Sequence, residues 1–242
     1  MEIGQKMIAK HCEIGKRLSF LRVLVWAACW TVFIGSVHAQ TNFQIVKSFG
    51  FAALSTGAEP ESQMIFGADG KLYGVTSAGG SNGVGVIFAM NSAGSGYQVL
   101  HSFAGGANDG SYPAAELLQA SDGMLYGTAE GGGANSIGVI FRINTDGTGF
   151  GLVHSFYYTD GESPEAGLLQ AREDGMLYGT ASTGGVNGYG GTVFKVNLDG
   201  SDFEVVYNFT IQTGVGCYSG LLEGADGFLY GTTYSDGDGN DS

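Results

Sequence analysis

Apolar residues in this chain gather in short runs of aromatic and β-branched residues, separated by glycine, aspartate or asparagine. After residue 40, no apolar spacing of three and four persists long enough for a helix. Asp-Gly pairs join successive runs, and this dipeptide between two apolar runs is a strong signal for a β-hairpin. The pattern therefore predicts an all-β protein built from short antiparallel strands.

The runs repeat with a fixed period. The motif Asp-Gly-x-Leu-Tyr-Gly occurs four times, and its tyrosines are 53, 52 and 52 residues apart. These tyrosines are Tyr73, Tyr126, Tyr178 and Tyr230. The three prolines follow the same period, with spacings of 53 and 51 residues. A period of this size is typical of propellers, solenoids and other repeat arrays.

Each repeat of about 52 residues contains four predicted strands, called a, b, c and d here. In the second repeat they centre on Leu118, Tyr126, Ile140 and His154. Four antiparallel strands in a unit of this length are typical of a propeller blade. In the first repeat, strand c is apolar throughout residues 86–90, which predicts burial of both its faces between neighbouring blades. A parallel β-helix is the rival fold, but its rungs are shorter and lack regular Asp-Gly hairpins.

These patterns divide the chain into a signal peptide over residues 1–39 and a β-propeller-like repeat domain over residues 40–242. Within the domain we expect strand d at 43–49, repeats over about 60–103, 113–156 and 164–209, and a partial repeat over 217–242. Because strand c of the last repeat is missing, we expect an incomplete array, either truncated or part of a longer propeller. We also expect residues 41–49 to form the outer strand of a blade completed from the C-terminal region, with unpaired edges that promote self-association.

The first 39 residues carry the basic, apolar and small segments of a secretory signal peptide, in that order. Five Lys and Arg residues precede an apolar run over residues 23–34, and small residues then lead to Ala39. This run is shorter than the roughly 20 residues of a membrane-spanning helix; a retained anchor is the alternative. We therefore expect a signal helix, cleavage after Ala39, and a secreted or surface-displayed protein with no membrane insertion after cleavage.

Cleavage would leave a strongly acidic chain. Residues 1–39 hold five of the ten basic and two of the 23 acidic residues, which leaves five against 21. This balance argues against nucleic acid or an anionic membrane as the partner, since both attract positive charge. Of the three cysteines only Cys217 would remain, so we expect no intrachain disulfide and a fold held by packing and strand pairing.

Four repeated motifs carry a resemblance to a known family. They are Pro-x-(Ala/Ser)-x-Leu-Leu, Asp-Gly-x-Leu-Tyr-Gly-Thr, Gly-(Thr/Val)-(Val/Ile)-Phe and His-Ser-Phe, with a Gly-Gly loop between the second and third. Over residues 43–234 the chain resembles the Gloeobacter/Verrucomicrobia-type tandem repeat of exported bacterial choice-of-anchor proteins. The resemblance implies a secreted or surface-displayed repeat protein, often with a C-terminal sorting anchor, and no established enzymatic activity. Because no such anchor is recognisable before Ser242, truncation is again our expectation.

The two histidines beyond the signal segment, His101 and His154, occupy one position of successive repeats. As catalytic bases they would act in two clusters, His101 with Ser102 and Asp109, and His154 with Ser155 and Asp160. A catalytic cluster occurs once in an enzyme, however, and the equivalent positions hold Lys47 and Tyr207. We therefore favour a structural role, in which each polar side chain bonds within its blade, and we assign no catalytic residue.

Other candidate sites are equally weak. The tail residues Asp236, Asp238 and Asn240 have the alternate spacing of a calcium loop but lack its later glycine and its glutamate. The glycine loops are not phosphate loops, since no helix or Lys-Ser/Thr follows them. The four repeated tyrosines are candidates for a sugar-stacking channel, but packing between blades with bonded hydroxyls is favoured. We assign no metal ligand and no cofactor.

The sequence favours an exported, non-catalytic repeat protein that binds an extracellular ligand, protein or glycan, or mediates cell-surface interaction. The alternative is a propeller-based polysaccharide hydrolase or lyase. The repeat discriminates between the two, because an enzyme should carry charged residues in one unit that the other units lack. Outside the C-terminal tail, the sequence alone offers no convincing example.

Overall fold

The computed structural model describes residues 45–49 and 55–235, and nearly all regular structure in them is β-strand. The predicted signal peptide and the acidic tail beyond residue 235 lie outside the described residues. Within the described part, no helix is long and apolar enough to cross a membrane. The prediction of an all-β fold is confirmed.

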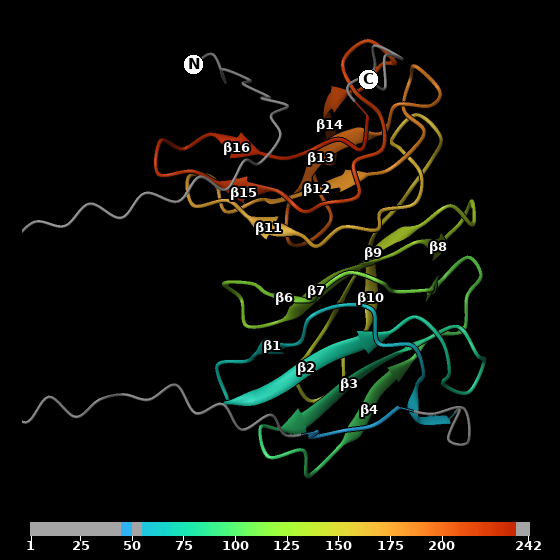
Figure 1. Cartoon of the computed structure of the whole chain (residues 1–242), viewed down its shortest axis with the longest axis vertical. Coiled ribbons are helices and arrows are strands. Elements are labelled where there is room, and N and C mark those ends of the chain that lie inside the picture. Colours follow the sequence, from blue (N-terminus) through green and yellow to red (C-terminus); the bar gives the residue numbers. More distant parts are fainter. Residues whose placement is uncertain (1–44, 50–54, 236–242) are drawn as a thin grey trace, which may run out of the picture. The chain divides into compact units, whose positions relative to one another are not determined.

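Three four-stranded sheets follow one another along the chain (Figure 1). The first contains β1 (Ile65–Phe66), β2 (Lys71–Thr76), β3 (Val86–Asn91) and β4 (Gln98–Ser102). The second contains β6 (Leu118–Gln119), β7 (Leu125–Ala129), β9 (Val139–Ile143) and β10 (Gly151–Ser155). The third contains β11 (Leu169–Gln170), β12 (Leu177–Ala181), β13 (Thr192–Val196) and β14 (Glu204–Asn208). Two short pairs are β5 (Gly110–Ser111) with β8 (Gly131–Gly132), and β15 (Leu222–Glu223) with β16 (Leu229–Tyr230).

Each four-stranded sheet is one predicted repeat, with strands a, b, c and d paired antiparallel in chain order. We call the three sheets blade 1, blade 2 and blade 3. The pair β15–β16 corresponds to strands a and b of a fourth unit. The pair β5–β8 joins the connection before strand a of blade 2 to the loop after its strand b. The described residues thus form a β-propeller-like array of four-stranded antiparallel blades.

The N-terminal strand predicted over residues 43–49 is not formed in the described part, because residues 45–49 have no strand hydrogen-bonding pattern. A strand needs a neighbour to satisfy its backbone groups, and no described strand pairs with this segment. The segment still packs on blade 1 as each strand d packs on the next blade. Phe49 lies 5.2 Å from Phe88 between ring centroids, the distance found for the equivalent pair at the next junction. Completion of its blade by C-terminal strands stays a prediction.

Strand d of every blade contains a β-bulge that the sequence did not reveal. The extra residues are Leu100 in β4, Val153 in β10 and Val206 in β14. The carbonyl of Leu100 lies against the c–d turn of the next blade, where a Cβ on Gly147 would be 3.2 Å from that oxygen. Since Gly147 also has a φ of +89°, this close approach between blades requires glycine.

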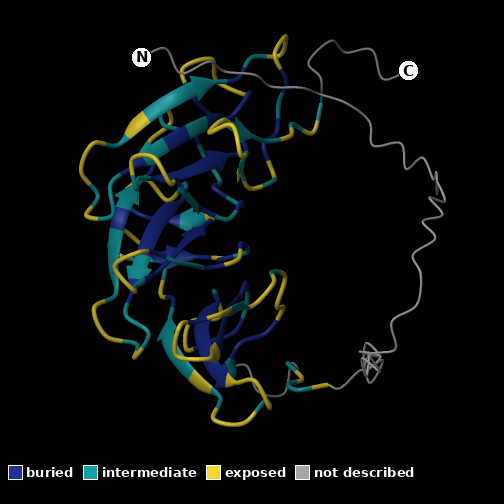
Figure 2. Ribbon diagram, turned by 90° about the vertical axis from the view of Figure 1, so that its left-hand side faces the viewer, coloured by how far each residue is buried: buried dark blue, intermediate teal, exposed yellow. Residues whose placement is uncertain are grey.

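The core lies between the blades. Residues 86–90 of β3 are at most 4% exposed, so the predicted burial of both faces of strand c is confirmed. One apolar cluster joins blades 1 and 2 through residues such as Tyr73 and Phe141, and another joins blades 2 and 3 through Tyr126 and Phe194. Figure 2 shows buried residues in the inner strands and exposed ones in turns and loops. Burying one such side chain contributes about 1.5–3 kcal/mol, so the junctions between blades hold the array together.

Candidate functional site

The repeated Asp-Gly-x-Leu-Tyr-Gly motif fastens the a–b turn of each unit. The Tyr73 hydroxyl donates to Asp69 Oδ2 at 2.9 Å, and Asp69 Oδ1 accepts from the Lys71 backbone N–H at 3.1 Å. The same arrangement recurs in Asp122–Tyr126, Asp174–Tyr178 and Asp226–Tyr230. Burial, together with Asp69, raises the pKa of Tyr73 to about 12. Because the tyrosines of blades 1 to 3 are buried, they do not line an open channel.

Each histidine contacts the aspartate of its predicted cluster but not the serine. His101 Nε2 lies 3.1 Å from Asp109 Oδ1, and His154 Nε2 lies 3.1 Å from Asp160 Oδ2. The neighbouring serines bond elsewhere: Ser102 Oγ accepts from Ser81 N, and Ser155 Oγ accepts from Ala134 N. Adjacent residues of a strand point to opposite faces of the sheet, so neither His-Ser-Asp cluster assembles.

The histidine position makes a contact between blades. The His101 ring stacks on Phe150 of the next blade, with 3.6 Å between centroids, and His154 stacks on Phe203 at the same distance. In the N-terminal segment the equivalent residue is Lys47, whose Nζ lies 4.1 Å from the centroid of the Tyr97 ring. Burial lowers the pKa of His154, although Asp160 acts in the opposite direction. The residue at this position thus covers the equivalent aromatic ring at all three places, as a histidine at two of them and a lysine at the third.

Cys217 is not poised for nucleophilic chemistry. Its thiol is free and buried. Burial raises the pKa of this thiol to about 12. Since the thiolate is the nucleophilic form of cysteine, Cys217 acts as a small apolar residue at neutral pH.

The two ends of the blades differ in their side chains. The turn rim comprises the a–b and c–d turns, at residues 67–70, 91–97, 120–124, 144–150, 171–176, 197–203 and 224–228. The loop rim comprises the b–c and d–a connections, at residues 55–64, 77–85, 103–117, 130–138, 156–168, 182–191, 209–221 and 231–235. Backbone hydrogen bonds from Tyr112 to Val84 and from Ser163 to Ile137 join the loops of neighbouring blades, so the loop rim is continuous across these junctions.

Exposed tyrosines are confined to the loop rim. Of the 12 tyrosines in the chain, six are between 49% and 84% exposed. All six belong to the loop rim: Tyr112, Tyr157, Tyr158, Tyr189, Tyr218 and Tyr234. The other six lie in strands or in a c–d turn and are buried or half-buried.

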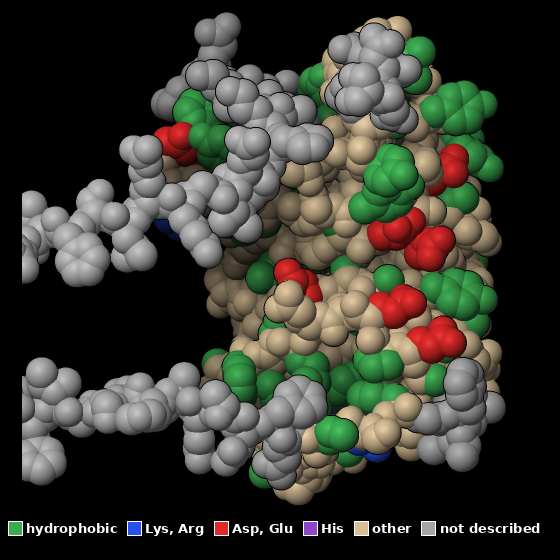
Figure 3. All heavy atoms as spheres, viewed as in Figure 1, with side chains coloured by type: hydrophobic (Ala, Val, Ile, Leu, Met, Phe, Trp, Pro, Cys, Tyr) green, Lys and Arg blue, Asp and Glu red, His purple; other side chains and the backbone are tan. Residues whose placement is uncertain are grey.

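Basic residues also differ between the two rims. The described residues contain five Lys and Arg, and four of them lie in the turn rim or within two residues of it. These four are Lys71, Arg142, Arg172 and Lys195, and the fifth is Lys47. No described loop-rim residue is basic, whereas its acidic residues are Glu59, Glu61, Asp109, Glu116, Glu130, Asp160, Glu162 and Glu165. In Figure 3, carboxylates and hydrophobic side chains lie next to one another over the loops at the right of the view.

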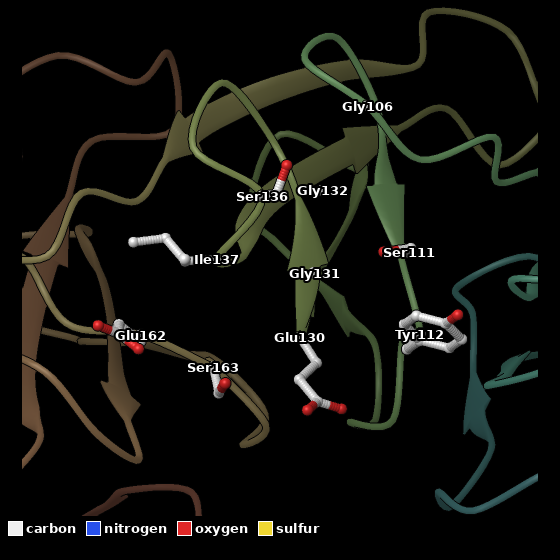
Figure 4. A pocket seen from close by; sticks show the side chains of 10 residues that line it. All are labelled: Gly106, Ser111, Tyr112, Glu130, Gly131, Gly132, Ser136, Ile137, Glu162 and Ser163. Carbon is white, nitrogen blue, oxygen red and sulfur yellow. The ribbon is translucent and has the colours of Figure 1, made fainter.

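A polar hollow of about 350 Å³ opens in the loop rim between blades 2 and 3. Its walls carry the side chains of Ser111, Tyr112, Glu130, Ser136, Ile137, Glu162 and Ser163, beside three glycines. Figure 4 shows Glu130 between Glu162 and Ser163 on one side and Ser111 and Tyr112 on the other. Neither glutamate forms an ion pair with a basic residue of the described part.

The residue before each repeated proline, Glu59, Tyr112 or Ser163, has a left-handed backbone, and two of these three residues line the hollow. Five non-glycine residues in the described part have a positive φ, and three of them line the hollow: Tyr112 at 58°, Ser136 at 60° and Ser163 at 51°. Such conformations cost of order 1–3 kcal/mol and persist where the surroundings impose them. Here the backbone hydrogen bonds between blades hold Tyr112 and Ser163 in place.

A family model described as the Gloeobacter/Verrucomicrobia repeat matches residues 31–242. The chain belongs to this family. No curated protein matches this repeat protein. The match extends over all three blades and the β15–β16 pair, so the resemblance that the motifs carry is confirmed.

Solved structures similar to this Gloeobacter/Verrucomicrobia repeat protein are distant in sequence. A chain of a nidogen/laminin complex is 13% identical with a TM-score of 0.46, over 69% of this chain and 52% of that chain. A gluconolactonase of Xanthomonas campestris is 17% identical with a TM-score of 0.45, over 72% and 58%. An α-L-arabinofuranosidase of Clostridium thermocellum is 13% identical with a TM-score of 0.40, over 74% and 73%. The repeat protein therefore spans only 52% and 58% of the first two chains, and no residue role is transferred from any of them.

Two residues of the hollow are charged where the other units have uncharged residues. Glu130 stands where blades 1 and 3 have Ser77 and Ser182, whose hydroxyls donate to the backbone oxygens of Glu59 and Ser163 at 3.2 and 3.1 Å. Glu162 stands where the other units have alanine, serine and valine. No such break of the repeat outside the tail is convincing in the sequence alone, and these two were overlooked. Separated in the sequence, each looks like ordinary variation, and only the fold brings them to one hollow.

The pKa of a third carboxylate, that of Glu165, is affected by Glu130. Burial raises the pKa of Glu165, and the charge of Glu130 raises it further. The Ser182 hydroxyl, 3.3 Å from Glu165 Oε1, acts in the opposite direction. Negative charge is therefore concentrated here, and no Lys or Arg of the described residues forms an ion pair with these carboxylates. Within the described part no three His, Cys, Asp or Glu residues are grouped to hold a metal ion, and the tail at Asp236 to Asn240 lies outside it.

Proposed function

We propose that this protein is a non-catalytic binding protein that contacts an extracellular partner through its loop rim. The observation that carries the proposal is the confinement of all exposed tyrosines in the described residues to that rim. Tyrosine supplies a large, rigid contact area at low entropic cost, together with a hydroxyl for hydrogen bonding, and it is enriched in binding hot spots. A surface kept only for solubility would not collect such residues at one end of the sheets.

The histidine pairs support the same conclusion. Both occur at equivalent positions and stack on the next blade, and a contact that holds blades together explains their repetition. Export is a proposal that rests on the predicted signal peptide alone. N-terminal sequencing of the secreted protein should begin at Gln40.

A polysaccharide hydrolase or lyase is the second candidate. It draws support from Glu130 and Glu165, since glycoside hydrolysis uses two carboxyl groups of which the acid has a raised pKa. The binding proposal is favoured because the exposed tyrosines extend along the loop rim from Tyr112 to Tyr234, beyond one carboxylate pair.

The test uses the full chain, exported by a bacterial host, labelled and applied to arrays of polysaccharides and purified surface proteins. Tyr112→Ser with Tyr189→Ser removes two exposed rings from the loop rim, and Phe66→Ser with Phe228→Ser is the matched control elsewhere. We expect array binding to fall about tenfold in the first variant and less than about twofold in the control. Equal loss in both variants would contradict the proposal. Release of reducing sugar that disappears in Glu130→Gln would favour the enzyme.

A further inference from the structure

The loop rim combines three features that ordinary blade packing does not require: exposed tyrosines, carboxylates that form no ion pair with a described Lys or Arg, and the hollow between blades 2 and 3. We infer that this rim docks a basic polypeptide, and that the hollow accepts a lysine or arginine side chain between Glu130, Glu162 and the Tyr112 ring. This inference rests on the proposed binding function and adds the chemistry of the partner.

The distribution of charge is the first argument. All Lys and Arg ion pairs of the described part lie at or beside the turn rim: Asp69 with Lys71 at 3.1 Å, Glu223 with Arg172 at 3.1 Å and Glu204 with Lys195 at 3.0 Å. The described loop rim has no Lys or Arg at all. Complementary charge steers partners together and repels those of the wrong sign. An uncharged partner would gain nothing from a surface of one sign, and an anionic one would be repelled.

The chemistry of the hollow is the second argument. A guanidinium or ammonium group is attracted both by carboxylates and by the face of a tyrosine ring. This chain already uses the aromatic contact internally, where Lys47 Nζ lies over the Tyr97 ring. In the hollow, Tyr112 is 49% exposed and available to a ligand. A cation would also relieve the repulsion between Glu130 and Glu165.

The broken repeat is the third argument. At the Glu130 position, blades 1 and 3 are stabilised by a serine that bonds the backbone of the adjacent segment. The fold is therefore satisfied by serine, and the carboxylate of blade 2 is not explained by packing. A ligand explains why it lines the same hollow as Glu162, which is also charged where the other units have uncharged residues.

The probe is a lysine-rich peptide, compared with a peptide in which glutamine replaces every lysine and with a neutral polysaccharide. Binding to the purified full chain is measured by fluorescence anisotropy at low and high salt. Glu130→Ser with Glu162→Ser removes two carboxylates from the hollow and introduces the serines found in other blades. The control, Glu173→Ser with Glu204→Ser, removes the same charge from the other end of the blades.

We expect the Kd for the lysine peptide to rise about tenfold in the hollow variant and less than about twofold in the control, and binding to weaken in high salt. Equal weakening in both variants, or salt-insensitive binding of the glutamine peptide or the polysaccharide, would overturn the inference. If the lysine peptide does not bind while the tyrosine variant still loses array binding, the inference fails and the proposed function stands. If the tyrosine variant binds as before, the proposed function fails.

Discussion

The turn rim and the loop rim are made from the same repeats, yet they differ in how faithfully they repeat. At the turn rim, the bond between tyrosine hydroxyl and aspartate occurs in all four units. A side-chain oxygen also reaches the preceding unit at each junction, from Gln119 to Ala68 N, from Gln170 to Ser121 N and from Glu223 to Arg172 N. At the loop rim, backbone bonds and a few side-chain bonds recur, such as those from Asn82 to the Phe103 carbonyl and from Asn135 to the Phe156 carbonyl, but the exposed side chains vary.

The side chains that hold the blades together are therefore different from those that are available to bind a partner. Side chains of the turn rim and of the junctions bond or pack against the next unit, so a change there disturbs the fold. Loop-rim side chains such as Glu130 and Tyr189 project from loops whose backbone is already satisfied. New chemistry can accumulate there at little structural cost. Four substitutions test whether the two rims differ in this way.

The largest effect is expected at the junction core. Phe141→Ala removes a fully buried ring that joins blades 1 and 2, and should lower the free energy of unfolding by about 3–5 kcal/mol. Tyr189→Ala, at a 79% exposed position of the loop rim, should change it by less than about 0.5 kcal/mol. Urea denaturation measures both. Similar decreases in the free energy of unfolding for the two variants would show that the junction core and the loop rim contribute equally to stability.

A smaller effect is expected at the repeated turn. Tyr126→Phe removes hydrogen bonds to Asp122 Oδ2 at 2.8 Å and to the Leu198 carbonyl of the next blade at 3.2 Å. Because the ring is buried, the cost should be about 1–2 kcal/mol. Tyr230→Phe is the control at a half-buried copy and should cost less. A neutral Tyr126→Phe would show that the hydroxyl does not hold the junction.

The histidine junction should respond to pH. Burial lowers the pKa of His154 in the folded state below its ordinary 6.5, so the neutral ring is favoured by folding. Its contribution is fully present above pH 6.5 and is lost as pH falls through the lowered pKa. The free energy of unfolding should therefore decrease on acidification, and His154→Phe should remove that part of the decrease. Tyr207→Phe, at the equivalent site of blade 3, should leave the pH dependence unchanged.

The smallest effect is expected at the hollow. Glu130→Ser should lower the pKa of Glu165 toward its ordinary 4.5, because a like charge is removed while burial remains. Carboxyl NMR measures this pKa, and Glu173→Ser at the turn rim should not change it. Stability should change by less than about 0.5 kcal/mol. An unchanged pKa of Glu165 would mean that the two carboxylates do not interact.

Much of the blade could be predicted from the sequence. Strands, hairpins and the burial of residues 86–90 follow from local patterns. A strand is predicted from the apolar residues that are consecutive in the chain, and a hairpin turn is predicted from the Asp-Gly pair. The strand over 43–49 was predicted by the same reasoning and is not formed in its described residues, because pairing requires a partner as well as a pattern. The bulge at Leu100 left no local signal either.

The all-β class, the four strands of each unit and their period can be predicted from the amino-acid sequence, because they depend on residues close together in the chain. The stacking of His101 on Phe150 and the hollow that Glu130 and Glu162 share become visible only in the folded chain. These groups lie some thirty to fifty residues apart in the sequence. They meet because stacked blades bring matching ends of successive repeats side by side, and that arrangement is set by packing across the junctions.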